Sequence, residues 1–179
     1  MAAIKSLTEN EVLKLKATVL YILDKCGELD YLHLFKILYF ADREHYAKYG
    51  RRIIQDTFCA LKDGPVPSKL YDAMKGNQGT YSTCTPYPTY YYIQRATACP
   101  DMDELSRSDI EMLDKSIKEN ISLTYSELSS KSHDIAWEEA WNAENNSAIN
   151  PFSMAMAGGA NEAMMCYIRE HEEINSLLN

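Results

Sequence analysis

The segment from Asp30 to Tyr49 constrains the fold most, because it is apolar on nearly every side of the helix that its spacing predicts. One stripe of this helix holds Leu34, Ile37, Leu38 and Ala41, and its other faces carry Leu32, Phe35, Tyr39 and Phe40. A helix that is apolar all round is normally buried. We therefore expect it to lie at the centre of the fold and to end at Gly50.

Capping patterns predict where further helices begin. Thr8 and Glu11 fit a capping box, in which each side chain satisfies a backbone N–H of the other residue. Gly27 provides a stop for this helix near Lys25. The remaining predicted helices begin at Ser106 and Thr124 and span residues 133–141 and 159–178.

Short β signals replace the helical pattern in the middle of the chain. The predicted order is a strand at residues 56–62, a turn at 64–67, a helix at 68–75, a loop at 76–89 and a strand at 90–93. The run Tyr90–Ile93 has strong strand propensity, and we expect it to pair with the strand before the turn.

Together these patterns predict a mostly α (α+β) fold, in which helices surround a central buried helix and a small antiparallel β element is inserted. The length of 179 residues predicts a single domain over residues 1–179, with residues 142–179 as its C-terminal helical part.

The charge balance argues against some classes of partner. The formal net charge is −8, and no strong basic patch interrupts it. Nucleic-acid affinity comes largely from cationic side chains that contact phosphates, so we expect no nucleic-acid partner. An acidic surface suits a soluble protein or a partner for a basic protein.

The five cysteines are odd in number, widely spaced and without a C-x-x-C pair. This pattern predicts reduced thiols rather than a disulfide framework or a structural zinc site. No secretory signal and no apolar run of membrane-spanning length is found, so we expect a cytoplasmic location without a membrane.

The stretch KDGPVPSKLYD, residues 62–72, contains two prolines beside one glycine. A phosphate-binding loop needs several free backbone N–H groups, whereas prolines have none. We therefore predict a rigid and exposed corner between a strand and a helix. Such a corner presents side chains to a partner with little loss of entropy on binding.

Charged residues interrupt the central helix at Asp42, Arg43 and His45. Charged groups on so apolar a helix need partners. We predict a buried polar network that ties the helix to the sheet, and catalysis is the less favoured alternative.

Other chemistry has weaker support. No nucleophile elbow or cysteine-protease signature occurs, and the histidines are too far apart to predict a metal site. Trp137 and Trp141 are four residues apart and should stack on one helix face. They are either core anchors or, where exposed, anchors for a protein partner.

Several blocks of the chain resemble one known family. These blocks are KILYFADREHYAKYG (residues 36–50), Arg52-Ile53, FCALKDGPVPS (58–68), Leu70-Tyr71-Asp72 and SELSSKSHDIAW (126–137). In order and spacing they resemble the Panacea (SocA-like, phage-associated) antitoxin domain. The resemblance covers roughly residues 8–141, and the segment after Asn142 is not matched securely.

The resemblance implies a largely helical domain that acts without catalysis as the antitoxin of a toxin–antitoxin pair. Members of the family are thought to neutralise a neighbouring toxin by direct binding, and some relatives resemble adaptors that deliver a toxin to a protease. Many members carry an additional helix-turn-helix module. This chain begins directly with the domain, so we do not expect it to repress transcription.

We therefore expect this chain to bind a cognate protein toxin, with no cofactor and no metal, and leave its oligomeric state open. The partner-binding residues expected from rigidity and side-chain type are Asp63, Pro65, Pro67, Tyr71, His133 and Trp137. The alternatives are an adaptor that delivers a toxin to a protease and an enzyme that uses His45 or His133.

Overall fold

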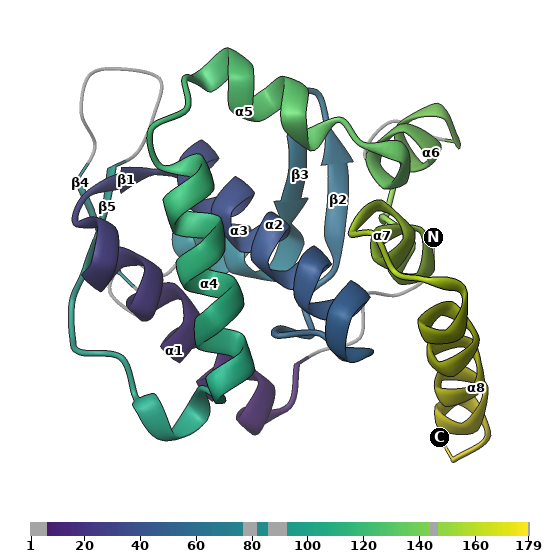
Figure 1. The fold of residues 1–179 in the computed structure, drawn as a ribbon. Helices are drawn as coiled ribbons and strands as arrows, with labels where there is room; N and C mark the ends of the chain where they lie inside the picture. The colour runs from purple at the N-terminus through teal and green to yellow at the C-terminus, as the bar shows by residue number, and fades with distance from the viewer. Residues whose placement is uncertain (1–6, 77–81, 86–92, 144–146, 179) are drawn as a thin grey trace.

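Helices surround one central helix in this protein (Figure 1). The computed structural model describes residues 7–76, 82–85, 93–143 and 147–178. The helices are α1 (Glu9–Cys26), α2 (Tyr31–Tyr49), α3 (Ser68–Gly76), α4 (Arg107–Asn120), α5 (Tyr125–Ser132), α6 (Ile135–Ala143), α7 (Pro151–Ala157) and α8 (Glu162–Leu178). The strands are β1 (Leu29–Asp30), β2 (Phe58–Leu61), β3 (Gly64–Pro67), β4 (Ser82–Thr85) and β5 (Ile93–Ala96), and a 3-10 helix spans Met102–Glu104. The predicted mostly α fold with a small antiparallel β element is confirmed.

The central helix is α2, as its apolar sequence predicts. It packs against α4, α5, α7 and β3, and side chains such as Leu34 and Ile37 are completely buried. Each such burial contributes about 1.5–3 kcal/mol to stability. Asp30 begins the helix by accepting a hydrogen bond from the backbone N–H of His33 at 2.9 Å, and Gly50 ends it with a φ of 67°.

The predicted capping patterns are also confirmed. At the start of α1 the backbone N–H of Thr8 donates to Glu11 Oε2 at 2.7 Å, and the helix ends at Gly27, whose φ is 78°. The equivalent pairs are Ser106 with Asp109 in α4 and Thr124 with Glu127 in α5. Partners three residues apart form these contacts whatever the rest of the fold does.

The proline stretch forms a strand, and the prediction of a turn over residues 64–67 is wrong. Strand β3 pairs antiparallel with β2, and the turn of this hairpin is formed by Lys62 and Asp63. Prolines cannot donate to a ladder, but an edge strand tolerates them where the missing N–H would face away from its neighbour. Pro65 pairs opposite Ala60, and Pro67 pairs opposite Phe58.

The second sheet has the strand order β1-β5-β4. The prediction that the strand near Ile93 pairs with the strand before the turn is therefore wrong, because β5 pairs with β1 and β4. Strand β4 lies within the predicted loop, where the β-branched Thr83 and Thr85 favour a strand. Tyr90, Tyr91 and Tyr92 lie outside the described residues.

Strand β2 also contacts the C-terminal part of the chain. The backbone N–H of Ala60 donates to the carbonyl of Ser147 at 2.9 Å, and the N–H of Ile149 donates to the carbonyl of Phe58 at 2.8 Å. This short extended segment lies on the side of β2 away from β3. It joins the hairpin to α7, which follows directly.

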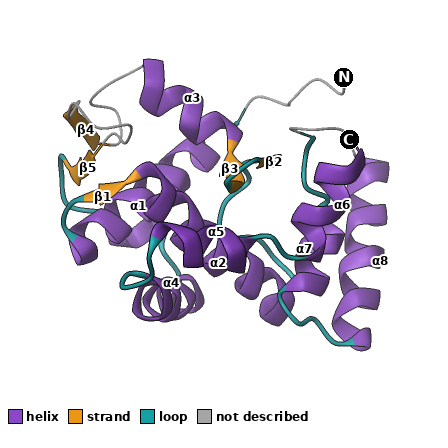
Figure 2. Cartoon of the chain, turned by 90° about the horizontal axis from the view of Figure 1, so that it is seen from above, coloured by secondary structure: helices purple, strands orange, loops and turns teal. Residues whose placement is uncertain are grey.

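Helices α7 and α8 pack against each other on the opposite side of the molecule from β1, β4 and β5 (Figure 2). The last helix begins at Glu162, slightly later than its predicted start at Gly159, because Gly159 has a φ of 89°. Within the described ranges, no helix is both long and apolar enough to cross a membrane.

Gly64 is the position where the hairpin tolerates no side chain. Its φ is 102°, and an added Cβ would collide with Ser132 Oγ and lie 2.7 Å from Lys36 Cε. We predict that Gly64→Ala lowers the free energy of unfolding by about 3 kcal/mol or more, because backbone strain and overpacking both contribute. Denaturant unfolding followed by circular dichroism measures this loss.

Gly159→Ala is the matched control for this substitution. Gly159 has a comparable φ of 89°, but no atom lies within 4 Å of its added Cβ. Its alanine variant should lose only the strain energy, about 1 kcal/mol. Equal losses in the two variants would show that the close approach at Gly64 does not matter.

Candidate partner-binding site

The tip of the β2–β3 hairpin is held by side chains from three helices. On one side Lys36 Nζ of α2 donates a hydrogen bond to the carbonyl of Pro65 at 2.9 Å. On the other side Trp137 Nε1 of α6 donates to the carbonyl of Leu61, also at 2.9 Å. Ser132, at the end of α5, lies directly against Gly64. The hairpin is thus fixed from both of its strands.

His133 and the two tryptophans form a stack beside the hairpin. The rings of His133 and Trp137 are 3.7 Å apart and nearly parallel, and Trp137 stacks on Trp141 at 5.3 Å. The predicted stacking of the tryptophans is confirmed, and both side chains are half-buried. Burial lowers the pKa of His133, and the nearby Lys36 cation lowers it further. His133 Nε2 is buried and has no hydrogen-bond partner among the described residues.

Asp134 holds this stack against the central helix. Its carboxylate accepts hydrogen bonds from Arg43 Nη1 at 2.8 Å and from the hydroxyl of Tyr39 at 2.9 Å. It also accepts one from the backbone N–H of Trp137 at 3.0 Å, which fixes the first turn of α6. Arg43 and Tyr39 both belong to α2, so Asp134 joins the two helices.

Asp42 and His45 lie deeper, and both are fully buried. Asp42 accepts hydrogen bonds from Arg52 Nε at 2.5 Å and from the backbone N–H of Ile53 at 2.6 Å. His45 Nδ1 lies 2.8 Å from the carbonyl of Arg51, and its Nε2 lies 3.0 Å from Ser108 Oγ. These partners belong to the loop after α2 and to α4, rather than to the sheet that the sequence suggested.

The nitrogens of His45 are therefore both engaged. A carbonyl only accepts, so Nδ1 carries the proton that it donates to Arg51. Burial lowers the pKa of His45, and its Nε2 lies beside both the Ser108 hydroxyl and Asp109 Oδ1, which is 3.2 Å away. The arrangement leaves neither nitrogen available to a substrate.

An apolar groove of about 390 Å³ opens between the hairpin and the N-terminal half of α2. The aromatic part of its lining is an ordered cluster, in which Tyr31 and Phe35 stack at 5.3 Å and Tyr71 meets each ring edge-on at 5.9 Å. Val66 of β3 adds an aliphatic wall, and Asp63 stands at the rim. We call this feature the hairpin groove.

Lys36 also lines the hairpin groove, and it was not among the predicted site residues. Only 1% of its surface is exposed, and burial lowers its pKa to about 7, although the nearby Asp63 raises it. A sequence signal existed, because Lys36 stands between Phe35 and Ile37 in a helix that is apolar on nearly all sides. A helix that is apolar on nearly all sides is surrounded by other elements, so a lysine at this position is expected to be buried.

The expected partner-binding residues do not all share one surface. Asp63 is exposed on the hairpin turn and Tyr71 is half-buried in the hairpin groove, whereas His133 and Trp137 are half-buried on the Leu61 side of the hairpin. Pro65 and Pro67 are buried, so the prediction that they lie in an exposed corner is wrong. As ladder residues in β3 they turn towards the core, and they support the surface from beneath.

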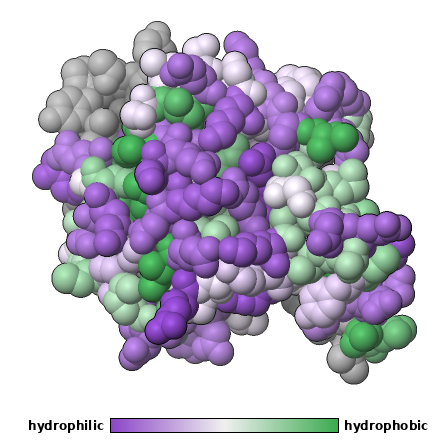
Figure 3. All heavy atoms as spheres, in the orientation of Figure 1, coloured by the Kyte–Doolittle hydropathy of each residue, from purple (hydrophilic) through white to green (hydrophobic). Residues whose placement is uncertain are grey.

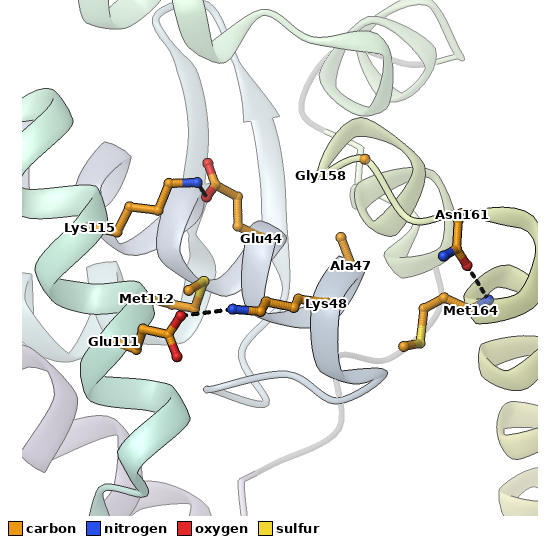
Figure 4. A pocket seen from close by; sticks show the side chains of 10 residues that line it. Glu44, Ala47, Lys48, Glu111, Met112, Lys115, Gly158, Asn161 and Met164 are labelled. Atoms are coloured by element: carbon orange, nitrogen blue, oxygen red, sulfur yellow. Dashed lines mark hydrogen bonds and ion pairs between the residues drawn. The ribbon is translucent and has the colours of Figure 1, made fainter.

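A larger cleft of about 550 Å³ lies between α2, α4 and the connection from α7 to α8 (Figure 4). Its charged side chains are already paired, since Lys48 contacts Glu111 at 2.7 Å and Lys115 contacts Glu44 at 2.6 Å. A charged ligand would have to break one of these pairs, so this cleft is the weaker candidate. Among the described residues, no cluster of three or more histidine, cysteine or acidic side chains could hold a metal ion.

Exposed apolar side chains also gather on α8. In the view of Figure 3 the surface over α4 is mostly hydrophilic, while hydrophobic atoms appear near the end of α8. The large apolar side chains exposed on this helix include Tyr167, Ile174 and Leu177.

Comparison with known protein families gives a match. A family model described as "Antitoxin SocA-like, Panacea domain" matches residues 34–141. The matched range contains the hairpin and all the side chains that hold its tip, and it ends before α7 and α8. No curated protein and no solved structure matches the chain.

The low pKa of Lys36 leads to a prediction about stability. Because the folded-state pKa of about 7 lies below the ordinary 10.5, the unfolded chain binds the proton more tightly. Burial of Lys36 therefore lowers the free energy of unfolding only slightly above pH 10.5. This loss grows as the pH falls and reaches about 5 kcal/mol near pH 7 and below. Lys36→Met removes this cost but also the hydrogen bond to Pro65, which is worth about 1 kcal/mol.

We therefore expect Lys36→Met to be more stable than the wild type by about 4 kcal/mol at pH 6, with a gain that shrinks towards pH 10. Denaturant unfolding across this range measures the difference. Lys118→Met is the control, because Lys118 is exposed on α4 and its replacement should give no such trend. A variant Lys36→Met that is less stable than the wild type at every pH would contradict this assignment.

Proposed function

Because this chain belongs to the SocA-like Panacea antitoxin family, we propose that it neutralises a cognate protein toxin by binding to it directly. The observation that carries this proposal is the family match itself, which covers the hairpin and the helices that hold it. We infer that the protein acts without catalysis and blocks the active surface of its toxin.

The surface that we propose for this contact is centred on the exposed hairpin turn. Lys62 and Asp63 project from the turn, the hairpin groove lies on one side, and Trp137 lies on the other. Aromatic side chains are favoured anchors at protein interfaces. The hairpin is already fixed by hydrogen bonds from Lys36 and Trp137, so little entropy is lost on binding.

The paired nitrogens of His45 support a role without catalysis, because neither is free to move a proton for a substrate.

We further propose that residues 1–179 form one domain. The hydrogen bonds between β2 and residues 147–149 support this proposal, because they join the matched part of the chain to α7. The five unpatterned cysteines support a reducing, cytoplasmic setting.

Co-expression with the protein encoded by the adjacent gene tests the proposal. That protein should be toxic alone and harmless together with this chain, and the two purified proteins should form a complex without a protease present. Failure of the wild-type chain both to bind and to protect would overturn the antitoxin proposal. Protection that requires a protease would instead favour the adaptor alternative.

A charge reversal at the hairpin turn tests the proposed surface. Lys62→Glu should weaken binding to the toxin at least about tenfold, because rim charges at an interface steer association and oppose mismatched partners. Lys118→Glu is the matched control, since Lys118 is also exposed but lies on α4. Calorimetry on purified proteins measures both. Equal affinities for the two variants would place the interface elsewhere.

A further inference from the structure

The most unusual group in the molecule is the buried ammonium of Lys36. In the part of the chain that the structure describes, its Nζ has one hydrogen bond, to the neutral carbonyl of Pro65. No carboxylate of a described residue lies within 4.0 Å of it, although an ammonium can donate three hydrogen bonds. A buried cation with so few partners is unfavourable unless something else supplies the missing charge.

The surroundings of Lys36 offer a place for such a partner. The hairpin groove, which Lys36 lines, is open to solvent and presents Phe35, Val66 and Tyr71 as an apolar wall. An aliphatic or aromatic side chain placed there would be removed from water. Lys36 is only 1% exposed, so an anionic group next to that side chain would reach the ammonium through a small shift of the side chains that cover it. The groove thus combines an apolar surface with one buried positive charge.

We propose that the hairpin groove binds a segment of the toxin in which a carboxylate lies beside an apolar side chain, with the carboxylate paired to Lys36 Nζ. This inference rests on the proposed antitoxin function, and it assigns the chemistry of the recognised segment. A carboxylate supplies the charge-assisted hydrogen bonds that Lys36 lacks. The apolar side chain packs against Phe35, Val66 and Tyr71, and the apolar surface that it removes from water contributes to the affinity.

The other charged groups near Lys36 are compatible with this occupant. Asp63 raises the pKa of Lys36 from the hairpin turn, but it is exposed and forms no ion pair with it, so water screens its charge. His133 faces Lys36 from the end of α5, and its lowered pKa keeps the ring neutral at pH 7. Lys62, exposed on the same turn, adds a positive charge at the rim.

A carboxylate bound to Lys36 should make binding pH-dependent. The occupant requires the charged lysine, whose pKa of about 7 in the empty groove must rise on binding. Affinity should therefore be highest below pH 7 and fall up to about tenfold per pH unit above it, until the pKa of the bound state is reached. Binding at pH 7.5 should also take up protons from the buffer.

Two capped tripeptides of equal shape test the inference on the full chain. The probes are Ac-Leu-Glu-Leu-NH₂ and Ac-Leu-Gln-Leu-NH₂, followed by NMR titration of the wild type at pH 6.5 and pH 9. We expect the glutamate peptide to bind at least about tenfold more tightly at pH 6.5 and to lose most of this advantage at pH 9. Shifts should include Val66 and Tyr71.

Lys36→Met should remove the preference for glutamate and weaken binding to the toxin at least about tenfold, while Lys118→Met should retain both. Melting curves establish that both variants are folded, and the pH dependence in the wild type tests the inference without any substitution. Equal affinity for the two peptides, no shift with either peptide, or a preference that survives in Lys36→Met would overturn the inference.

These outcomes are separate from those of the antitoxin proposal. A chain that protects cells from the adjacent gene product but does not distinguish the two peptides would refute only the groove chemistry. A chain that prefers the glutamate peptide but neither binds nor neutralises that product would refute the antitoxin role and leave the carboxylate preference in place.

Discussion

The close packing of Gly64 between Lys36 and Ser132 determines how the hairpin sits on the helices. With a positive φ and no side chain, this residue lets the backbone of β3 approach α2 closely enough for Lys36 to reach the carbonyl of Pro65. The same approach places Leu61 within reach of the Trp137 indole. A larger residue at position 64 would separate the hairpin from both contacts.

The same packing buries Lys36 beside the hairpin. A methionine in place of Lys36 would fill similar space without the cost of desolvation, so stability alone does not account for the lysine. Residues that reduce stability are common where a protein binds a partner. The position of Lys36, at the wall of an open groove rather than in a closed core, agrees with that explanation.

The elements that could be predicted are those whose signals are local. The capping box of Thr8 and Glu11 and the stop at Gly50 each depend on residues a few positions apart. The pairing of β5 with β1 could not be predicted, because it depends on a meeting of segments more than 60 residues apart. The strand at Pro65 was missed because proline signals turns and edge strands alike.

The candidate site shows the same division between local and distant information. Trp137 and Trp141 were recognisable as a pair because they are four residues apart on one helix. The proximity of His133 to Lys36 was not recognisable, since the hairpin beside both residues comes from a third part of the chain. Burial lowers the pKa of both Lys36 and His133, and Lys36 lowers that of His133 further, so Lys36 is only partly charged at neutral pH while no partner is bound. An anionic partner would therefore raise the pKa of Lys36 and so increase the positive charge to which it binds. Removing the partner's carboxylate from water costs free energy, and only a partner with enough apolar contact in the groove could offset that cost.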